Sequence, residues 1–166
     1  MLGEKKYILT EATVSKKIAR LALEIIENNS EEEEIIFVGI EGKGVVLAKK
    51  IQEQVIANSS VRVNLITLKM DKTRSEPVAL SAALDFNGKV VILIDDVTNS
   101  GKTLLYALKP FLEFHPKKIR TLVLVERTHT LFPVTPDYKG LSLATTLQEH
   151  ITVEVENDKI TGAFLN

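Results

Sequence analysis

The chain has 166 residues, of which 45% are hydrophobic and 26% charged, as expected for one globular domain with a sizeable core. Its formal net charge of −1 excludes a broad positive field for nucleic acid, and no apolar run approaches the length of a membrane span. The lack of cysteine excludes disulfides, thiol catalysis and cysteine–zinc sites, and the three scattered histidines argue against a histidine-rich metal site.

The first half of the chain alternates between helical and strand patterns. Thr10 can cap a helix whose apolar positions keep helical spacing to about Asn28. Four consecutive glutamates then form a solvated loop before the next apolar run. The elements predicted after this loop are a buried strand at 35–40, a helix at 45–57, an alternating strand at 61–68 and a polar, mobile loop at 69–78.

The second half continues the same alternation. It contains a buried strand at 90–95, a helix at 102–114, a strand at 119–126 and a closing hairpin at 151–165 that turns at Asn157 and Asp158. This order predicts an α/β fold, with a central, mostly parallel twisted sheet and helices on both faces. No repeat or second domain is evident, so residues 1–166 are expected to form one domain.

The segment that follows the strand at 90–95 has the strongest chemical signature. Asp95 and Asp96 end the strand, and Ser100-Gly-Lys-Thr103 opens the next helix. Its small residues expose backbone N–H groups that can bind an anion at the carboxyl edge of a parallel sheet. The ATP-binding Walker pattern requires glycine where Asp96 stands. Carboxylates instead suit sugar hydroxyls or Mg2+, so a phosphorylated sugar with metal-bound pyrophosphate fits both halves of the segment.

Residues 94–103 resemble the phosphoribosyl-pyrophosphate (PRPP) loop of the type I phosphoribosyltransferases. The resemblance implies that the acid pair Asp95 and Asp96 holds the ribose 2′- and 3′-hydroxyls, acts in catalysis and contacts Mg2+. It also implies a 5′-phosphate site at the end of the segment. The residues expected to bind PRPP are Val97, Thr98, Asn99, Ser100, Gly101, Lys102 and Thr103.

Two further segments would contact the leaving pyrophosphate in such an enzyme. The glycine-rich turn after the strand at 35–40 resembles the pyrophosphate loop of the family. Glu41 departs from the family pattern, because a carboxylate beside pyrophosphate is unfavourable unless it contacts Mg2+ or points away. Residues 69–78 correspond in order to the flexible hood that closes over the site and excludes water. The expected pyrophosphate-binding residues are Glu41, Gly42, Lys43, Gly44, Lys72 and Arg74.

Over most of its length, the chain resembles one subfamily of these enzymes. Residues 123–129, 131–134 and 136–140 are similar to the successive motifs of the pyrimidine-operon attenuators (PyrR), which resemble uracil phosphoribosyltransferases in activity and bind a leader RNA. The basic positions of that family fall here on Thr130, Thr135 and Leu141, and its first-helix Thr-Arg-x-x-His pattern falls on residues 19–23. Losing several cations and polar contacts removes much of the counterion release that drives RNA binding, so RNA is not an expected partner.

The purine transferases of the hypoxanthine type offer an alternative within the same fold. Their PRPP loop carries an aspartate that serves as the base near purine N7, and Asn99 stands at that position here. An amide cannot take the proton, so the pattern favours a pyrimidine. Arg127 can donate to an exocyclic oxygen of either base class, and is equally compatible with a surface ion pair.

The sequence therefore predicts transfer of 5-phosphoribosyl from PRPP to a nucleobase, with uracil as the expected acceptor and Mg2+ as cofactor. The alternatives are a PRPP or nucleotide sensor without catalysis, an RNA-binding attenuator and a purine transferase. Relatives of this fold commonly form dimers or tetramers, so a homo-oligomer is expected. A cytoplasmic, non-membrane protein is also expected, because residues 1–7 lack the apolar core of a signal peptide.

Overall fold

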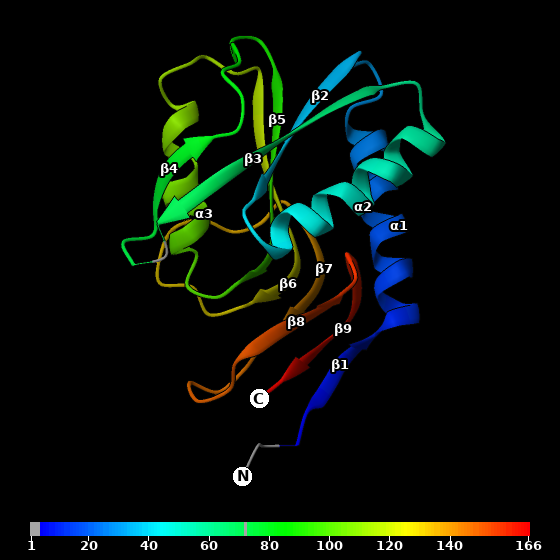
Figure 1. Ribbon diagram of the computed structural model, residues 1–166, viewed down its shortest axis with the longest axis vertical. Coiled ribbons are helices and arrows are strands. Elements are labelled where there is room, and N and C mark those ends of the chain that lie inside the picture. The colour runs from blue at the N-terminus through cyan, green and yellow to red at the C-terminus, as the bar shows by residue number, and fades with distance from the viewer. Residues whose placement is uncertain (1–3, 72) are drawn as a thin grey trace.

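The computed structural model describes residues 4–71 and 73–166, which form two sheets flanked by helices (Figure 1). The larger sheet has six strands in the order β4-β3-β2-β5-β6-β7, all parallel to their neighbours except β4. This confirms the predicted α/β fold with a mostly parallel sheet. The strands of this sheet are β2 (Glu34–Ile40), β3 (Arg62–Asp71), β4 (Glu76–Leu80), β5 (Val90–Thr98), β6 (Lys118–Arg127) and β7 (Tyr138–Leu143).

The central strands are continuously apolar because both faces of the sheet are covered. In β2 and β5, Phe37 and Ile92 face the cluster under helices α1 (Glu11–Asn28) and α2 (Lys43–Asn58). Their neighbours Val38 and Leu93 face a second cluster, under α3 (Lys102–Ala107) and the 3-10 turn η1 (Lys109–Phe111). Figure 1 shows α1 and α2 on one side of the sheet and α3 on the other.

Helix α1 begins where the sequence predicts. The Thr10 hydroxyl accepts a hydrogen bond from the Thr13 N–H at 3.3 Å, and the two hydroxyl groups are 2.9 Å apart. Val14, Leu21 and Ile25 are buried along one face, as their spacing predicts. None of the helices in the described part of the chain has the length and apolarity needed to span a bilayer.

A smaller antiparallel sheet lies beyond the carboxyl ends of β5 and β6 (Figure 1). It pairs the predicted C-terminal hairpin, β8 (Ile151–Glu156) and β9 (Lys159–Leu165), with β1 (Lys6–Thr10). The Asn157–Asp158 turn has positive φ at both residues, as a two-residue hairpin requires. The sequence did not predict β1, whose short apolar run gains its pairing only from residues about 150 positions away.

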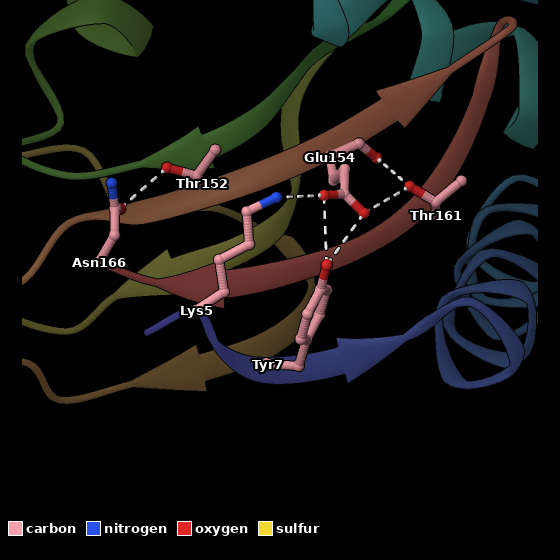
Figure 2. A network of polar contacts seen from close by, with 6 residues as sticks. All are labelled: Lys5, Tyr7, Thr152, Glu154, Thr161 and Asn166. Carbon is pink, nitrogen blue, oxygen red and sulfur yellow. Dashed lines mark hydrogen bonds and ion pairs between the residues drawn. The ribbon is translucent and has the colours of Figure 1, made fainter. Parts of the chain in front are cut away.

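Polar side chains tie the three strands of the small sheet together (Figure 2). The Glu154 carboxylate on β8 accepts hydrogen bonds from Lys5 at 2.9 Å, from the Tyr7 hydroxyl at 3.3 Å and from Thr161 at 3.0 Å. Tyr7 also packs against Phe164, with ring centroids 5.7 Å apart. The network crosses from β1 to both strands of the hairpin, so it fixes the N-terminal strand on the small sheet.

The prediction of a loop at residues 69–78 is wrong for most of this segment. β3 continues to Asp71 and β4 starts at Glu76, which leaves a tight turn in place of a long loop. Asp71 closes this turn, because its carboxylate accepts the N–H of Thr73 at 2.8 Å and its carbonyl accepts the N–H of Ser75 at 2.7 Å. The polar sequence is compatible with a strand because β4 is an edge strand, where charges and Pro77 are tolerated.

Two other elements differ from the prediction. The helix expected at 102–114 ends at Ala107 and gives way to a 3-10 turn, because Pro110 has no N–H to donate to the preceding turn of an α-helix. β7 was missed because Pro133 and Pro136 suggested irregular structure. The strand instead starts at Tyr138, just beyond the second proline.

The cap of α1 gives a direct test of local stability. Replacing Thr10 with alanine removes the acceptor for the Thr13 N–H, so the free energy of unfolding should fall by about 1 kcal/mol. Urea titration of Thr10→Ala and of the exposed control Ser15→Ala measures this difference. A Thr10→Ala protein as stable as the wild type would show that the cap contributes nothing.

Candidate active site

The carboxyl ends of β2, β3 and β5 enclose a polar cavity of about 220 Å³. The edge of a parallel sheet is where such folds bind ligands, because helix N-termini converge there. Two of the predicted loops and the β3–β4 hairpin all contribute to its wall. The lining residues are Ile40, Glu41, Met70, Asp71, Ser75, Asp95 and Thr103.

A larger cavity of about 410 Å³ lies beside β4 but lacks the chemistry for a phosphorylated ligand. Its lining contains no charged side chain and consists of Pro77, Val78, Ala79, Leu80, Ala82, Ala83, Leu84, Phe86, Pro110 and Phe114. The smaller polar cavity, which contains Asp95 and Thr103 of the predicted PRPP loop, is therefore the candidate active site.

Asp95 and Asp96 lie within β5, which continues to Thr98, so the strand is longer than predicted. The Asp95 carboxylate accepts the backbone N–H of Asp96 at 2.9 Å. Burial raises the pKa of Asp95 well above its ordinary value, and the neighbouring charge of Asp96 raises the pKa further. This carboxyl group is therefore held in a position that is unfavourable for its charge and would gain from a cation or hydroxyl donor.

Gly44 allows the start of α2 to pack against the end of β5. A Cβ atom at this position would lie 2.8 Å from the Ile94 carbonyl oxygen and 3.2 Å from the Asp95 carboxylate. Before it, the N-cap residue Gly42 has a φ of 93°, and no side chain of the described residues caps the helix. The first N–H groups of this helix therefore have no capping side chain, and an anion bound beside Glu41 could accept them.

Glu41 and Lys43 are exposed on either side of this turn, and the Glu41 N–H donates to the Leu68 carbonyl at 2.9 Å. Glu41 lines the cavity with Asp95 and Asp71, so the site carries three carboxylates. No group of three acidic or histidine side chains in residues 4–71 and 73–166 is arranged to hold a metal ion by itself.

The carboxylates of this site could hold Mg2+ only together with ligands from the substrate. It is commonly held by one or two carboxylates together with substrate phosphates, so a metal here would depend on the bound substrate.

The predicted phosphate loop is held in shape by a second segment that the sequence also singled out. The Ser100 carbonyl accepts the N–H groups of Leu131 at 2.9 Å and Phe132 at 3.0 Å. Gly101 has a φ of 85°, and a Cβ atom there would lie 3.2 Å from the Val134 carbonyl. Residues 131–134 therefore support the loop from one side.

The remaining predicted residues are distributed around the site. Arg74 is exposed in the turn between β3 and β4, and Lys72 lies outside the described residues. Asn99 is exposed just after β5. Arg127 is half-buried at the end of β6, where its Nη2 donates to the Thr146 carbonyl at 2.7 Å. This contact ties down the loop before β8, and base binding by Arg127 stays a prediction.

Asp71 and Ser75 were not predicted to line the site. They follow an apolar strand in the same way as the acid pair does, but the polar run around them concealed the hairpin. The pairing of β3 with β4 and the hydrogen bond from the Ser75 N–H to the Asp71 carbonyl bring the two residues together in one turn.

Known proteins resemble this chain in both sequence and architecture. Residues 6–158 match the phosphoribosyl transferase domain family. The chain belongs to this family. A protein of Microcystis aeruginosa named Bifunctional protein PyrR is 37% identical over 159 residues, which cover 90% of this chain and 89% of the relative. Its namesake in Clostridioides difficile is 32% identical over 162 residues and covers 92% of each chain.

The phosphoribosyltransferase fold is also evident from solved structures. A hypoxanthine-guanine phosphoribosyltransferase of Bacillus anthracis superposes with a TM-score of 0.76 at 21% identity and covers 96% of both chains. A hypoxanthine phosphoribosyltransferase of Trypanosoma cruzi gives a TM-score of 0.72 at 15% identity, covering 84% of this chain and 82% of its own. At these identities the likeness concerns the fold alone. The chain is thus a PRPP-dependent phosphoribosyltransferase of type I, similar to the PyrR subfamily.

The close packing at Gly44 predicts an unusual response to alanine. Alanine is favoured over glycine inside a helix, yet Gly44→Ala should destabilise the protein by about 1–3 kcal/mol, because the added methyl group meets a backbone oxygen. Chemical unfolding checks this, with Lys49→Ala at an exposed position of α2 as the control. A stabilised Gly44→Ala protein would contradict the contact.

The raised pKa of Asp95 predicts how stability depends on pH. The unfolded chain loses this proton near pH 3.9, whereas the folded protein keeps it to a higher pH. The folded state therefore binds more protons between these two values, and wild-type stability falls as the pH rises through them. Asp95→Asn keeps the oxygen that accepts the Asp96 N–H but carries no charge.

Asp95→Asn should consequently be more stable than the wild type at pH 7, and the difference should vanish near pH 3.5. Thermal unfolding of both proteins across this pH range measures the effect. A variant less stable than the wild type at pH 7 would mean that the charge of Asp95 is well solvated.

Proposed function

We propose that the protein transfers 5-phosphoribosyl from PRPP to uracil and releases pyrophosphate. The main support is that Asp95 of the Asp95–Asp96 pair lines one cavity together with Glu41 and Thr103, which belong to the turns at residues 41–44 and 99–103. The pair offers acceptors for two sugar hydroxyls, and each turn offers backbone N–H donors to one phosphate group of the same substrate. The similarity to PyrR supports uracil as the acceptor.

Each side chain of the site has a defined task in this proposal. The carboxylates of Asp95 and Asp96 hold the ribose 2′- and 3′-hydroxyls and offset the positive charge that develops on the ribosyl ring. Residues 97–103 bind the 5′-phosphate. The first turn of α2, with Lys43 and with Arg74 from the hairpin, binds the leaving pyrophosphate. Bound Mg2+ would neutralise the pyrophosphate, with Asp95 and Asp96 as its protein ligands.

The reaction needs no covalent intermediate on the enzyme. The N1 atom of uracil forms the new bond to the ribosyl C1′ atom as the bond from C1′ to the pyrophosphate oxygen breaks, and the N1 proton is released. This agrees with a site that holds carboxylates, hydroxyls and backbone amides and includes no histidine among its described lining residues. In this proposal the hairpin turn at residues 73–75, whose Ser75 lines the cavity, closes over the bound substrate and excludes water from C1′.

Two features support an RNA-independent role. Leu141, where the attenuators carry a basic residue, packs against the hydrophobic core, and the exposed Arg20 on α1 is paired with Glu24 at 3.2 Å. Position 141 therefore carries no cation, and the cation of Arg20 has a carboxylate beside it, which weakens the attraction of this face for a phosphate backbone. The proposal also includes a homo-oligomer and a cytoplasmic location. Light scattering would measure the oligomeric state.

The acceptor base can be assigned by measuring pyrophosphate release from PRPP and Mg2+ with uracil, hypoxanthine, guanine, adenine and orotate in parallel. Release with uracil alone is the expected result. Release with a purine would mean that Asn99 does not exclude purines. PRPP binding without release in any reaction would indicate a sensor.

The acid pair should be indispensable for turnover. Asp95→Asn combined with Asp96→Asn should lower kcat/KM by about 100-fold or more, because the carboxylates stabilise charge that appears in the transition state. Asp85→Asn, which alters an exposed acid in the loop before β5, is the control and should retain activity. Turnover that survives in the double variant would refute the assigned role.

A further inference from the structure

Strand β6 ends in a buried carboxylate for which the proposed reaction gives no role. Glu126 is only 4% exposed. Its Oε2 atom accepts a hydrogen bond from the Ser142 hydroxyl at 2.7 Å and forms an ion pair with the Lys139 Nζ at 2.9 Å. Both partners lie on β7, so the three side chains join the end of β6 to the neighbouring strand.

The pair differs from the other ion pairs of the described residues in burial and in position. The side chain of Glu126 is 5% exposed, whereas the next most buried carboxylate, that of Glu32, is 19% exposed. Burying a charge is costly even when it is paired, so the pair is a poor means of gaining stability. It lies at the carboxyl edge of the sheet, where ligands bind, whereas the pairs of Glu32 and Glu34 lie at the opposite edge.

The strand register connects Glu126 directly to the phosphate loop. Thr98 on β5, Glu126 on β6 and Ser142 on β7 are successive partners across the sheet. In-register residues of parallel strands place their side chains on the same face at a spacing of about 4.8 Å, so these three form one polar row. Thr98, which is also 4% exposed, is the residue from which the loop at 99–103 departs.

A second connection runs along the chain. Five residues after Glu126, the segment 131–134 begins, and its first two N–H groups donate to the Ser100 carbonyl. Between them, the Thr128 N–H donates to the Leu143 carbonyl on β7 at 3.1 Å. The end of β6 thus fixes both the strand beside the phosphate loop and the segment that supports it.

We propose that Glu126, anchored by Lys139 and Ser142, is a positioning residue for the phosphate-binding loop. It acts through the register of Thr98 and through residues 131–134, without touching the substrate. This inference rests on the proposed PRPP site and assigns a residue to its support. Loss of the anchor should weaken phosphate binding and leave the acceptor site unchanged.

The test is calorimetric titration of PRPP, with Mg2+, into the full-length protein and its variants. Glu126→Gln and Lys139→Met should each raise the Kd for PRPP about tenfold, a change of about 1.4 kcal/mol. Lys139→Arg keeps the ion pair and should stay within about twofold of the wild type. Glu34→Gln, which breaks the half-buried pair with Lys89 at the opposite edge of the sheet, is the matched control.

The double variant Glu126→Gln with Lys139→Met separates positioning from simple loss of charge. If the two residues act as a unit, the Kd of the double variant equals that of either single variant, whereas independent effects multiply. Steady-state kinetics add a second readout, because the KM for PRPP should rise while the KM for uracil stays constant. A rise in both KM values, or multiplied effects on Kd, would overturn the proposal.

The outcomes distinguish this inference from the proposed function. A wild-type protein that does not bind PRPP refutes the proposed site itself. A wild-type protein that binds, together with folded Glu126→Gln and Lys139→Met variants that bind equally well, refutes only the positioning role. If both variants fail to fold in thermal unfolding, Ser142→Ala decides, since it removes only one hydroxyl group. A raised Kd in Ser142→Ala then supports the role, and an unchanged Kd contradicts it.

Discussion

Two adjacent carboxylates at the end of a buried parallel strand are the constraint on which the site depends. Asp95 is half-buried at the end of the apolar part of β5, and Asp96 follows it directly, so two like charges lie close together. Such an arrangement lowers stability unless the ligand supplies hydroxyl donors or a cation. A site of this kind gives up stability in the free protein in favour of complementarity to the bound substrate.

The rest of the structure brings anion-binding turns close to that pair. Gly44 removes the side chain that would separate α2 from β5, and Gly101 does the same between the phosphate loop and residues 131–134. The β3–β4 hairpin closes the third side with Asp71 and Ser75. The result is a narrow cavity lined by three carboxylates and two hydroxyl side chains, next to turns whose backbone N–H groups can complement the phosphates of a sugar substrate.

Much of this arrangement is visible in the sequence because its signals are local. The apolar runs of β2, β5 and β6, the cap at Thr10 and the turn at Asn157 and Asp158 each determine their own structure within a few residues. Parallel strands also bring their carboxyl ends to one edge, so the meeting of Gly44 with Asp95 follows from the fold class. The resemblance to phosphoribosyltransferases then predicts which part of PRPP each of the site residues binds.

The features that escaped prediction depend on partners distant in sequence. β1 exists because β9 offers it an edge, and β7 because β6 does. The pairing of β3 with β4 gives a polar segment a strand conformation that its composition does not favour. Glu126 had a readable signal, an acid that ends an apolar strand just as Asp95 does. Its anchoring by Lys139 depends on β7, and no local pattern revealed that strand.

The most direct test of the central claim is a crystal structure of the protein with PRPP and Mg2+. The account predicts the ribose hydroxyls within hydrogen-bonding distance of Asp95 and Asp96, the 5′-phosphate on the N–H groups of residues 99–103, and pyrophosphate at the start of α2. A PRPP molecule bound with its 5′-phosphate at residues 42–44, or bound away from the acid pair, would contradict it.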